Sequence, residues 1–489
     1  MRAELRVLAK DEVEAIDAAT VQLLERVGVS VREPRAMHLL EDAGAVRDGG
    51  TDRVRIPEAL LREAVRGTPK EWMWHAREAA KSFKVGGAKR TRLGPGSACT
   101  KILDFASGLP RAPTQQDGDA LVRLLDALEF ADIDYTPVSY GAADGNPRHR
   151  EAATLVRDLQ NTSKVLVGPT YDGAMARDSL EIARLLAGGE DELRKRPMVA
   201  GYCDPISPLT HDRMMTEALI EYATMGQPVF VMCLALAGAS APTSLAGVLV
   251  QQNAEILSGV LIAFLVNRRA PVVYGCVSGT MDMKAGNAAV GGPEFGLLSA
   301  AAVQVAHSYG LACSTGGQSD AKAHDAQASF EKGSSLLASM LAGADFVDLF
   351  FGSFEGFNVT SPEQVMIDHE IAGFAHRYAR GIEVDPAHLS LGLIEAVGPG
   401  GSFLKHPSAL RDTMSQMKAE WYLPGLFDRE SGDGKGTAPP VRLLDRAHEA
   451  SIRILNVHEP TPLDGGVLKE MMAVLDRIRK EESRPPGRN

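Results

Sequence analysis

The sequence carries no signature of a nucleotide-binding or hydrolytic enzyme. None of the patterns GxxxxGK[ST], HExxH or GxSxG occurs in its 489 residues, so a phosphate-binding P-loop, a helical zinc site and a nucleophile elbow are not expected. The chain also lacks an excess of positive charge, because 52 Lys and Arg against 63 Asp and Glu give a net charge of −11. Nucleic-acid binding requires the neutralisation of many phosphates, so we exclude nucleic acid as a partner. A local cationic site stays compatible with this net charge.

Long apolar runs are missing as well. No window approaches eighteen uncharged apolar residues, and the longest apolar stretch, residues 256–266, is interpreted as a buried helix. The first thirty residues interleave charges such as Lys10 and Glu14 with apolar positions, which is typical of an amphipathic helix and not of a signal peptide. We therefore expect a cytoplasmic protein without a membrane partner.

Cysteine is scarce, and the five cysteines form no CxxC pair and no local metal-binding spacing. Cys233, Cys276 and Cys313 fall inside apolar runs that we interpret as strands, and Cys203 directly follows such a run. The favoured interpretation is small buried thiols lining a barrel. A zinc site assembled from different strands is the alternative, and no metal ligand is assigned.

From about residue 92 onward, short apolar runs alternate with long amphipathic helical patterns. Each run is followed by a loop rich in Gly, Pro, Ser or Asp. The eight runs are 92–96, 136–140, 164–168, 198–202, 229–233, 272–276, 311–314 and 346–350. Their starts recur about every 36 residues, a usual length for one β-loop-α-loop unit, and several runs are apolar throughout, like strands buried on both faces. The sequence therefore predicts an α/β fold, specifically a (β/α)8 TIM barrel.

Local signals support this interpretation. Thr114 and Ser361 each stand three residues before an acidic or amide side chain, which is the pattern of a helix N-cap. A doubly wound open sheet is the alternative fold. That fold usually opens with a Gly-rich fingerprint turn, which Gly94-Pro95-Gly96 does not match.

We predict three regions in the chain. They are an N-terminal helical cap with short strands at residues 1–90, the barrel at 91–385 and a C-terminal extension at 386–489. The cap contains helical patterns at residues 10–30, 34–44 and 57–66, and short strands at 72–76 and 82–85 that cover the barrel floor. The extension is expected to pack on the barrel and to end in a charged, disordered tail at residues 480–489.

The loops that follow the strands are where a (β/α)8 barrel places its site. Two of them are dense in polar and aromatic residues. The loop after residues 311–314 contains Gly316, Gly317, Gln318, Asp320, Lys322 and His324. The loop after residues 346–350 contains Phe351, Phe354, Glu355, Phe357 and Asn358.

The second of these loops suggests a site for a quaternary ammonium group. Such a cation donates no hydrogen bond and must be held by aromatic faces and by negative charge. Glu355 would supply the charge. The predicted aromatic cage comprises Phe351, Phe354, Phe357, Tyr202 and Tyr274. Alternatively, these rings pack beneath the loop or against the C-terminal extension.

The first loop offers several weaker signals. Gly316 and Gly317 precede a helix, so their backbone N–H groups can hold an anion such as a substrate carboxylate. Asp320 and Lys322 either contribute to the site or form a local ion pair that rigidifies the turn. His324 is a possible general base, although the sequence shows no partner for it.

Several ordered blocks resemble the trimethylamine methyltransferase (MttB-like) superfamily from the N-terminus to about residue 450. The blocks are TMDMK at 280–284, GPE at 292–294, GQSDAK at 317–322, SPEQ at 361–364, IDHEI at 367–371 and PGLFDR at 424–429. The resemblance implies a (β/α)8 barrel that passes a methyl group from a small amine to Co(I) of a corrinoid, a cobalamin carried by a separate corrinoid protein and not bound covalently to this chain. We also expect a homo-oligomer.

Founding members of the superfamily use pyrrolysine, which this sequence lacks. By resemblance its position falls in residues 316–319, with Gln318 the closest match, and Gln318, Asp320 and Glu355 are the candidate catalytic residues. The chain is similar to the non-pyrrolysine branch, which implies a quaternary amine such as glycine betaine as the methyl donor. Two alternatives stay open, a zinc-dependent methyltransferase and a non-catalytic barrel that binds betaines.

Overall fold

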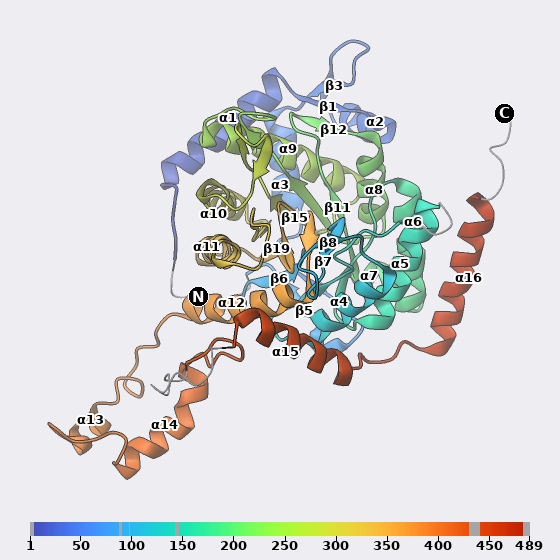
Figure 1. Ribbon diagram of the computed structural model, residues 1–489. Coiled ribbons are helices and arrows are strands. Elements are labelled where there is room, and N and C mark those ends of the chain that lie inside the picture. The colour runs from blue at the N-terminus through green and yellow to red at the C-terminus, as the bar shows by residue number, and fades with distance from the viewer. Residues whose placement is uncertain (1–3, 88–89, 97, 142–145, 430–440, 483–489) are drawn as a thin grey trace.

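Eight parallel strands form the centre of the protein in the computed structural model, which describes residues 4–87, 90–96, 98–141, 146–429 and 441–482 (Figure 1). In hydrogen-bonded order they are β6 (Arg92–Pro95), β19 (Phe346–Phe351), β18 (Ala312–Thr315), β15 (Val272–Cys276), β13 (Val229–Cys233), β11 (Val199–Cys203), β10 (Val165–Val167) and β9 (Ile133–Asp134). The sheet closes where the Asp132 N–H, just before β9, donates to the Leu93 carbonyl of β6 at 2.8 Å. The predicted (β/α)8 barrel is confirmed.

The second predicted strand is wrong in position. The barrel strand at this point is β9, only two residues long, and residues 136–140 form no regular strand. Pro137 has no N–H to donate to a ladder, and Val138 makes only an isolated bridge to Cys99. The chain therefore leaves the barrel wall earlier than the apolar pattern suggests, and Tyr135 and Thr136 already belong to the loop.

Helices surround the barrel, as the alternating pattern predicts. They are α4 (Gln115–Ala127), α5 (Pro147–Asn161), α6 (Gly173–Ala187), α7 (Glu190–Lys195), α8 (Arg213–Thr224), α9 (Leu245–Val266), α10 (Pro293–Ser308), α11 (Ala326–Ala342) and α12 (Pro362–Arg380). Thr114 caps α4 in a capping box with Asp117, and Ser361 caps α12 by accepting from the Gln364 N–H. These two contacts confirm the predicted helix starts.

The helix α9 is the most apolar segment of the chain. It is the single helix of the described residues that is long and apolar enough to cross a membrane, yet 89% of its most apolar window is buried inside the protein. Its neighbours include α1 (Lys10–Arg26), α3 (Glu58–Gly67), α8 and the strand β13. The predicted buried helix at residues 256–266 is confirmed within it.

A hairpin closes the floor of the barrel. β4 (Trp72–Trp74) pairs antiparallel with β5 (Phe83–Val85), and the Trp74 ring lies 5.7 Å from Phe230 and 6.0 Å from Phe346 inside the barrel. This layer agrees with the predicted short strands. The rest of the N-terminal cap consists of α1, α2 (Pro34–Asp42), α3 and three short strands, β1 (Val29–Val31), β2 (Val46–Arg47) and β3 (Arg53–Arg55). These strands form a small sheet of order β12-β1-β3-β2 with β12 (Thr210–His211), which follows the barrel strand β11.

The cysteines occupy the layer between the strands and the helices. All five are free and buried, and Cys233, Cys276 and Cys313 belong to the same apolar cluster as the helices around the barrel. Burial raises the pKa of the Cys276 thiol to about 11 and that of Cys99 to about 12. The interpretation of these residues as small buried thiols is confirmed.

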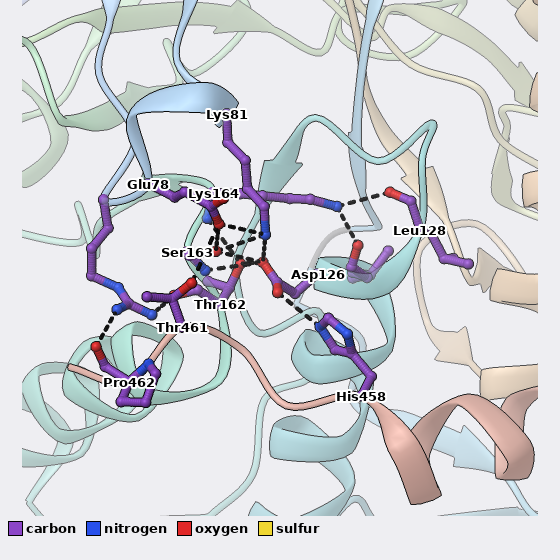
Figure 2. Close-up of polar contacts among 12 residues, drawn as sticks. Glu78, Lys81, Asp126, Leu128, Thr162, Ser163, Lys164, His458, Thr461 and Pro462 are labelled. Atoms are coloured by element: carbon purple, nitrogen blue, oxygen red, sulfur yellow. Dashed lines mark hydrogen bonds and ion pairs between the residues drawn. The ribbon is translucent and has the colours of Figure 1, made fainter.

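The end of the chain is fastened to the barrel floor through Asp126, which is buried at the end of α4 (Figure 2). Its carboxylate accepts from Lys81 Nζ at 2.9 Å and from the Thr162 hydroxyl at 2.8 Å, and it lies 2.9 Å from His458 Nε2. His458 directly follows α15 (Leu443–Val457), which packs on α12 and α4. The contact to His458 thus joins the C-terminal extension to the residues beneath β10.

The remaining extension departs from the prediction that it packs on the barrel. α16 (Gly465–Glu482) lies on α5 and α6, but α13 (Leu391–Val397) and α14 (Pro407–Glu420) form an arm that projects away from the barrel (Figure 1). Of the predicted disordered tail, residues 480–482 are helical, and residues 483–489 lie outside the described residues.

Candidate active site

A cavity of about 430 Å³ opens at the carboxyl ends of the barrel strands. Its walls come from residues that follow β9, β10, β11 and β13, from Leu349 in β19 and from one side of α5. A volume of this size suits a small ligand. This end of a (β/α)8 barrel is where its sites are built, so the cavity is the candidate active site.

Aromatic rings line the cavity on several sides. They come from the loops after β9 and β10, from the end of β11 and from the turn between β20 (Ser353–Phe354) and β21 (Val359–Thr360). The rings are those of Tyr135, Tyr140, Tyr171, Tyr202 and Phe357. The Tyr202 ring is fixed edge-on against Phe230 at 5.3 Å, while its buried hydroxyl has no hydrogen-bond partner among the described residues. That hydroxyl is free to meet a ligand.

Acidic side chains share the cavity with these rings. Asp204 follows β11, and Glu151 and Asp158 project from α5. One cation is present: Arg150 donates from Nε and Nη2 to the same Glu151 oxygen, at 2.9 and 2.6 Å. The lining therefore combines aromatic faces with three carboxyl groups, which is the environment that an organic cation needs.

The carboxyl groups of this region have raised pKa values. Burial raises the pKa of Asp158 to about 7 although Thr136 donates two hydrogen bonds to it. The pKa of Asp204 is also raised, by enclosure among the surrounding atoms and by the nearby Asp212, although this residue stays exposed to the cavity. Burial likewise raises the pKa of Asp348, next to the cavity, to about 7. A cation entering the cavity would favour ionisation of such groups. Perturbed carboxyl groups around a cavity are typical of a functional site.

The backbone beside the cavity is strained. Leu349, Glu355 and Phe357 have φ values of 58°, 51° and 72°, in the left-handed region that non-glycine residues rarely adopt. The register between β19 and β6 also shifts between Val347 and Phe351. Residues held in such conformations cluster at functional sites, and two of the three, Leu349 and Phe357, line the cavity.

The structure divides the predicted aromatic cage. Tyr202 and Phe357 line the cavity, whereas Phe351, Phe354 and Tyr274 are fully buried elsewhere. Tyr274 and Phe351 belong to the apolar layer beneath the helices. Phe354 packs with Leu103 and Val359, and its ring lies 5.3 Å from that of His324. The alternative, packing beneath the loop, therefore describes Phe354, whereas Phe351 and Tyr274 pack between the strands and the helices.

The three predicted catalytic residues support the loops around the cavity and do not line it. Gln318 is fully buried, and its side-chain amide donates to the Leu349 carbonyl and, at 2.8 Å, to the Ser353 hydroxyl. Asp320 accepts from the N–H of Val290 and of Gly291 at 3.2 and 2.8 Å. The Glu355 N–H donates to the Ala321 carbonyl at 3.0 Å. Gln318 therefore holds the backbone of Leu349, which lines the cavity, without lining the cavity itself.

The other predicted binding residues also lie outside the cavity lining. Gly316 and Gly317 are buried so tightly that an added Cβ would lie 3.0 Å from Phe295 or 2.6 Å from Phe350. Lys322 is exposed and donates to the Asp320 carbonyl at 2.6 Å, so the predicted side-chain ion pair is replaced by a bond to the backbone.

The last two predicted residues make local contacts. His324 Nε2 lies 2.7 Å from the Ser361 hydroxyl, and burial lowers the pKa of this histidine. Asn358 is exposed and donates to the Glu355 carbonyl. Both residues help to shape the loops that precede α11 and α12.

Several cavity residues were missed by the sequence analysis. Tyr135 was assigned to no site because the second strand was placed too late, and Arg150 and Asp158 lie on a helix that carried no motif. Asp204 stands two residues after Tyr202, in a loop that follows a correctly predicted strand. The position of Asp204 directly after a predicted strand was the one sequence signal that could have assigned it to the site.

The chain matches known proteins over nearly its whole length. Residues 2–483 match the trimethylamine methyltransferase (MTTB) family. The chain is 31% identical to the glycine betaine methyltransferase of Desulfitobacterium hafniense over 481 residues, which cover 97% of each chain. It is 33% identical to the trimethylamine methyltransferase MttB of Methanosarcina barkeri over 484 residues, 98% of this chain and 96% of that one.

A solved structure shares the fold. The monomethylamine methyltransferase MtmB of Methanosarcina barkeri superposes with a TM-score of 0.53 at 11% sequence identity, covering 98% of this chain and 88% of that chain. The sequence match spans nearly the whole length and the fold is the one that the sequence predicts. The chain belongs to the trimethylamine methyltransferase (MTTB) family.

Proposed function

We propose that this protein is a cytoplasmic methyltransferase that moves a methyl group from a quaternary amine, glycine betaine or a similar compound, to Co(I) of a corrinoid carried by a separate protein. The observation that carries the proposal is the cavity at the barrel mouth, where aromatic rings and carboxyl groups line the same small volume. A neutral ligand would gain little binding energy from the carboxyl groups. A permanently charged ammonium group is attracted both by the carboxyl groups and by the aromatic faces.

The chemistry of the donor favours a quaternary nitrogen. When a quaternary ammonium loses a methyl group, the leaving group is a neutral tertiary amine, so no proton has to be supplied. A neutral tertiary amine would leave as an amide anion unless its nitrogen were first made cationic. The cavity residues then have to bind and orient the donor with one methyl group facing the barrel mouth, and orientation of this kind can account for much of a rate enhancement.

Arg150 is the cavity residue suited to a carboxylate on the donor. Its guanidinium holds one Glu151 oxygen through Nε and Nη2, and it is the one Lys or Arg among the residues that line the cavity. A betaine bound with its ammonium group among the rings and its carboxylate at Arg150 would satisfy both ends. Lys322 is not retained for this role because it lies outside the lining.

Co(I) is a strong nucleophile that accepts a methyl group directly from a bound cationic donor. The residues around the cavity mouth fit the approach of a carrier protein, because Tyr171, Ile206, Leu234 and Met283 expose apolar surface on the loops that follow the strands. We assign no residue of this chain to hold the corrinoid itself. Gln318, Asp320 and Glu355 act as positioning residues that fix the loops bordering the cavity.

The direct test combines the purified protein, free cob(I)alamin and single candidate donors under anaerobic conditions. Loss of the Co(I) absorbance with glycine betaine or another quaternary amine, without loss with trimethylamine, is the expected result. Tyr202→Ala and Asp204→Asn should slow the reaction, and Asp282→Asn, outside the cavity, is the matched control. Tight donor binding with no methyl transfer to free or protein-bound corrinoid would instead support the betaine-binding barrel.

The zinc-dependent alternative is disfavoured by the positions of the thiols. All five cysteines are buried in the layer between the strands and the helices and lie outside the cavity lining. A catalytic zinc keeps an open position for its substrate, so cysteine ligands would have to reach the cavity. Among the described residues, the one group with metal-ligand proximity is Glu383, Asp385 and His388, which contains no cysteine.

A further inference from the structure

A second cavity, of about 670 Å³, lies away from the candidate active site. Its walls come from residues 128–130 between α4 and β9, from one face of α12, from the end of α14 with the residues that follow it, and from α15, which packs on α12 (Figure 1). Residues 128–130 lead into the amino end of β9, whereas the active-site cavity opens at the carboxyl ends of the strands. Among the described residues, none lines both cavities.

The second cavity is positively charged in a chain that is negatively charged as a whole. Four of its lining residues are cationic and two are acidic, an excess of two positive charges, whereas the whole chain carries a net charge of −11. These six residues are Arg377, Arg380, Lys418, Arg453, Glu129 and Glu370. A hollow lined by one sign of charge concentrates ligands of the opposite sign, so this cavity attracts anions.

Three of the four cations have no partner in the part of the chain that the structure describes. Arg380 lies in the last turn of α12, Lys418 in the last turn of α14 and Arg453 in α15, and none of them makes a hydrogen bond or an ion pair there. Arg377, in contrast, donates to carbonyls at the ends of α14 and α12, at 2.7 Å each. Unpaired like charges around one cavity repel each other, and a bound anion would remove that repulsion.

Two histidines of α12 add unused hydrogen-bonding groups to the same wall. His369 and His376 both line the cavity, and each ring lies 5.0 Å from the Phe130 ring. Neither imidazole makes a hydrogen bond with a described residue. Burial lowers the pKa of His369 to about 4 and that of His376 to about 3, and the neighbouring charges that lower them further are all positive. Each neutral ring therefore keeps one N–H that can donate to an anion.

A glycine shapes the aromatic wall of the second cavity. Gly373 lies between the two histidines on α12, and a Cβ at this position would overlap the Tyr422 ring. Without that atom the ring lies against the helix, where the Tyr422 hydroxyl is 3.5 Å from the Glu370 carbonyl oxygen. The Glu370 carboxylate accepts from the Gly425 N–H at 2.8 Å, which offsets part of its charge. Trp421, the next ring of this wall, is 56% exposed.

We propose that the second cavity binds a small polyanion, a molecule that carries two or more phosphate or carboxylate groups. Guanidinium and ammonium groups donate charge-assisted hydrogen bonds to both kinds of group. Three such cations on three different helices suit a ligand with several acidic groups, and a volume of about 670 Å³ suits a small molecule. The site is independent of the proposed methyl transfer, because the amine donor is a cation and binds at the other cavity.

Tryptophan fluorescence of the full chain provides a local test. Of the three tryptophans, Trp421 lines the second cavity, whereas Trp72 and Trp74 belong to β4. We expect inorganic triphosphate or citrate, titrated separately at low ionic strength to limit screening, to change the emission saturably. The probe that binds more tightly identifies phosphate or carboxylate as the preferred group. Trp421→Phe should lose most of the change in emission while still binding the probe in calorimetry.

Charge variants test whether the probe binds at this cavity. Arg380→Ala combined with Arg453→Ala should raise the Kd of the tighter probe at least about tenfold, because two charge-assisted hydrogen bonds are lost. Arg26→Ala with Arg66→Ala is the matched control, since it removes the same charge from two exposed arginines of the N-terminal cap and should change the Kd less than about twofold. Circular dichroism confirms that each variant is folded.

Three results would overturn the proposal. They are the absence of saturable binding of either probe at millimolar concentration, an unchanged Kd in the variant of Arg380 and Arg453, and an equal rise of the Kd in the control variant. Methyl transfer by the same variants is not part of the test, so a failure of the proposed function leaves these outcomes unaffected.

Discussion

Lys332 Nζ lies 2.8 Å from an Asp368 carboxylate oxygen, and both side chains are completely buried. The same ammonium group donates to the carbonyls of Phe350 and Ser353 at 2.5 and 2.6 Å, and Asp368 accepts from the Gly352 N–H at 2.7 Å. The pair therefore joins α11 and α12 to the turn that follows β19. The residues with left-handed backbone beside the cavity lie on both sides of that turn, Leu349 before it and Glu355 and Phe357 after it.

Removal of one partner of this pair should destabilise the protein strongly. Lys332→Met leaves the Asp368 carboxylate buried without its counter-charge, and we expect the free energy of unfolding to fall by about 3–5 kcal/mol. Lys84→Met is the matched control, because the Lys84–Glu71 pair is more than half exposed and should contribute less than about 1 kcal/mol. Urea unfolding of the three proteins measures the difference. Equal losses in both variants would contradict this role of the buried pair.

Two phenylalanines three residues apart should have separate effects. Phe357 lines the cavity, so Phe357→Ala should weaken quaternary-amine binding severalfold with little loss of stability. Phe354 is fully buried outside the cavity, so Phe354→Ala should instead lower the free energy of unfolding by about 3–5 kcal/mol. Calorimetric titration and urea unfolding of both variants distinguish the two roles. Weaker donor binding in Phe354→Ala together with unchanged binding in Phe357→Ala would contradict this assignment of Phe357 to the donor site.

Binding of the donor should strengthen with pH near neutrality. The pKa of Asp158, which is buried and lines the cavity, is about 7 because of burial, so its attraction for a cation is weak at pH 6 and nearly full at pH 8. Binding at pH 7 should also release protons, which appear as a buffer-dependent heat in calorimetry. Asp158→Asn should bind more weakly and with a flatter pH profile than wild type. An unchanged profile in this variant would remove Asp158 from the cation site.

Asp348 should make stability depend on pH in the opposite direction from a salt-bridged carboxylate. Burial raises its pKa to about 7 in the folded protein, against about 3.9 when unfolded. Between these values the folded protein holds a proton that the unfolded chain releases, so the free energy of unfolding falls as pH rises from 4 to 7 and levels off above 7.

The variant Asp348→Asn isolates this contribution. The loss for Asp348 alone amounts to about 4 kcal/mol across the range, so the wild-type curve should fall more steeply with pH than that of the variant. Urea unfolding at several pH values between 4 and 8 measures the difference. Parallel curves for the two proteins would show that Asp348 is ionised in the folded state.

The barrel could be predicted because most of its strands are buried on both faces and are therefore apolar throughout. β13 and β15 are found at the predicted residues, and every residue in both strands is buried. β9 was not predicted correctly because it is only two residues long, which is too short to give an apolar pattern. The apolar stretch that follows it contains Pro137 and forms no strand. The fold could therefore be predicted from the length and the burial of the strands, without the sequence motifs.

The cavity was harder to predict because it depends on the direction in which single side chains point. The register shift between Val347 and Phe351 changes which residues of β19 face the barrel interior, and no sequence pattern marks it. Phe351 therefore packs beneath the helices while Leu349, two residues earlier, borders the cavity. Tyr202 was identified because it stands at the end of a strand that was correctly placed.

The arm that carries α13 and α14 leaves the end of α12, whereas the cavity opens at the carboxyl ends of the barrel strands. Because a helix that follows a barrel strand runs back toward the amino ends of the strands, the two features lie at opposite ends of the barrel. Substitutions on the arm should therefore leave the contacts of a bound donor unchanged.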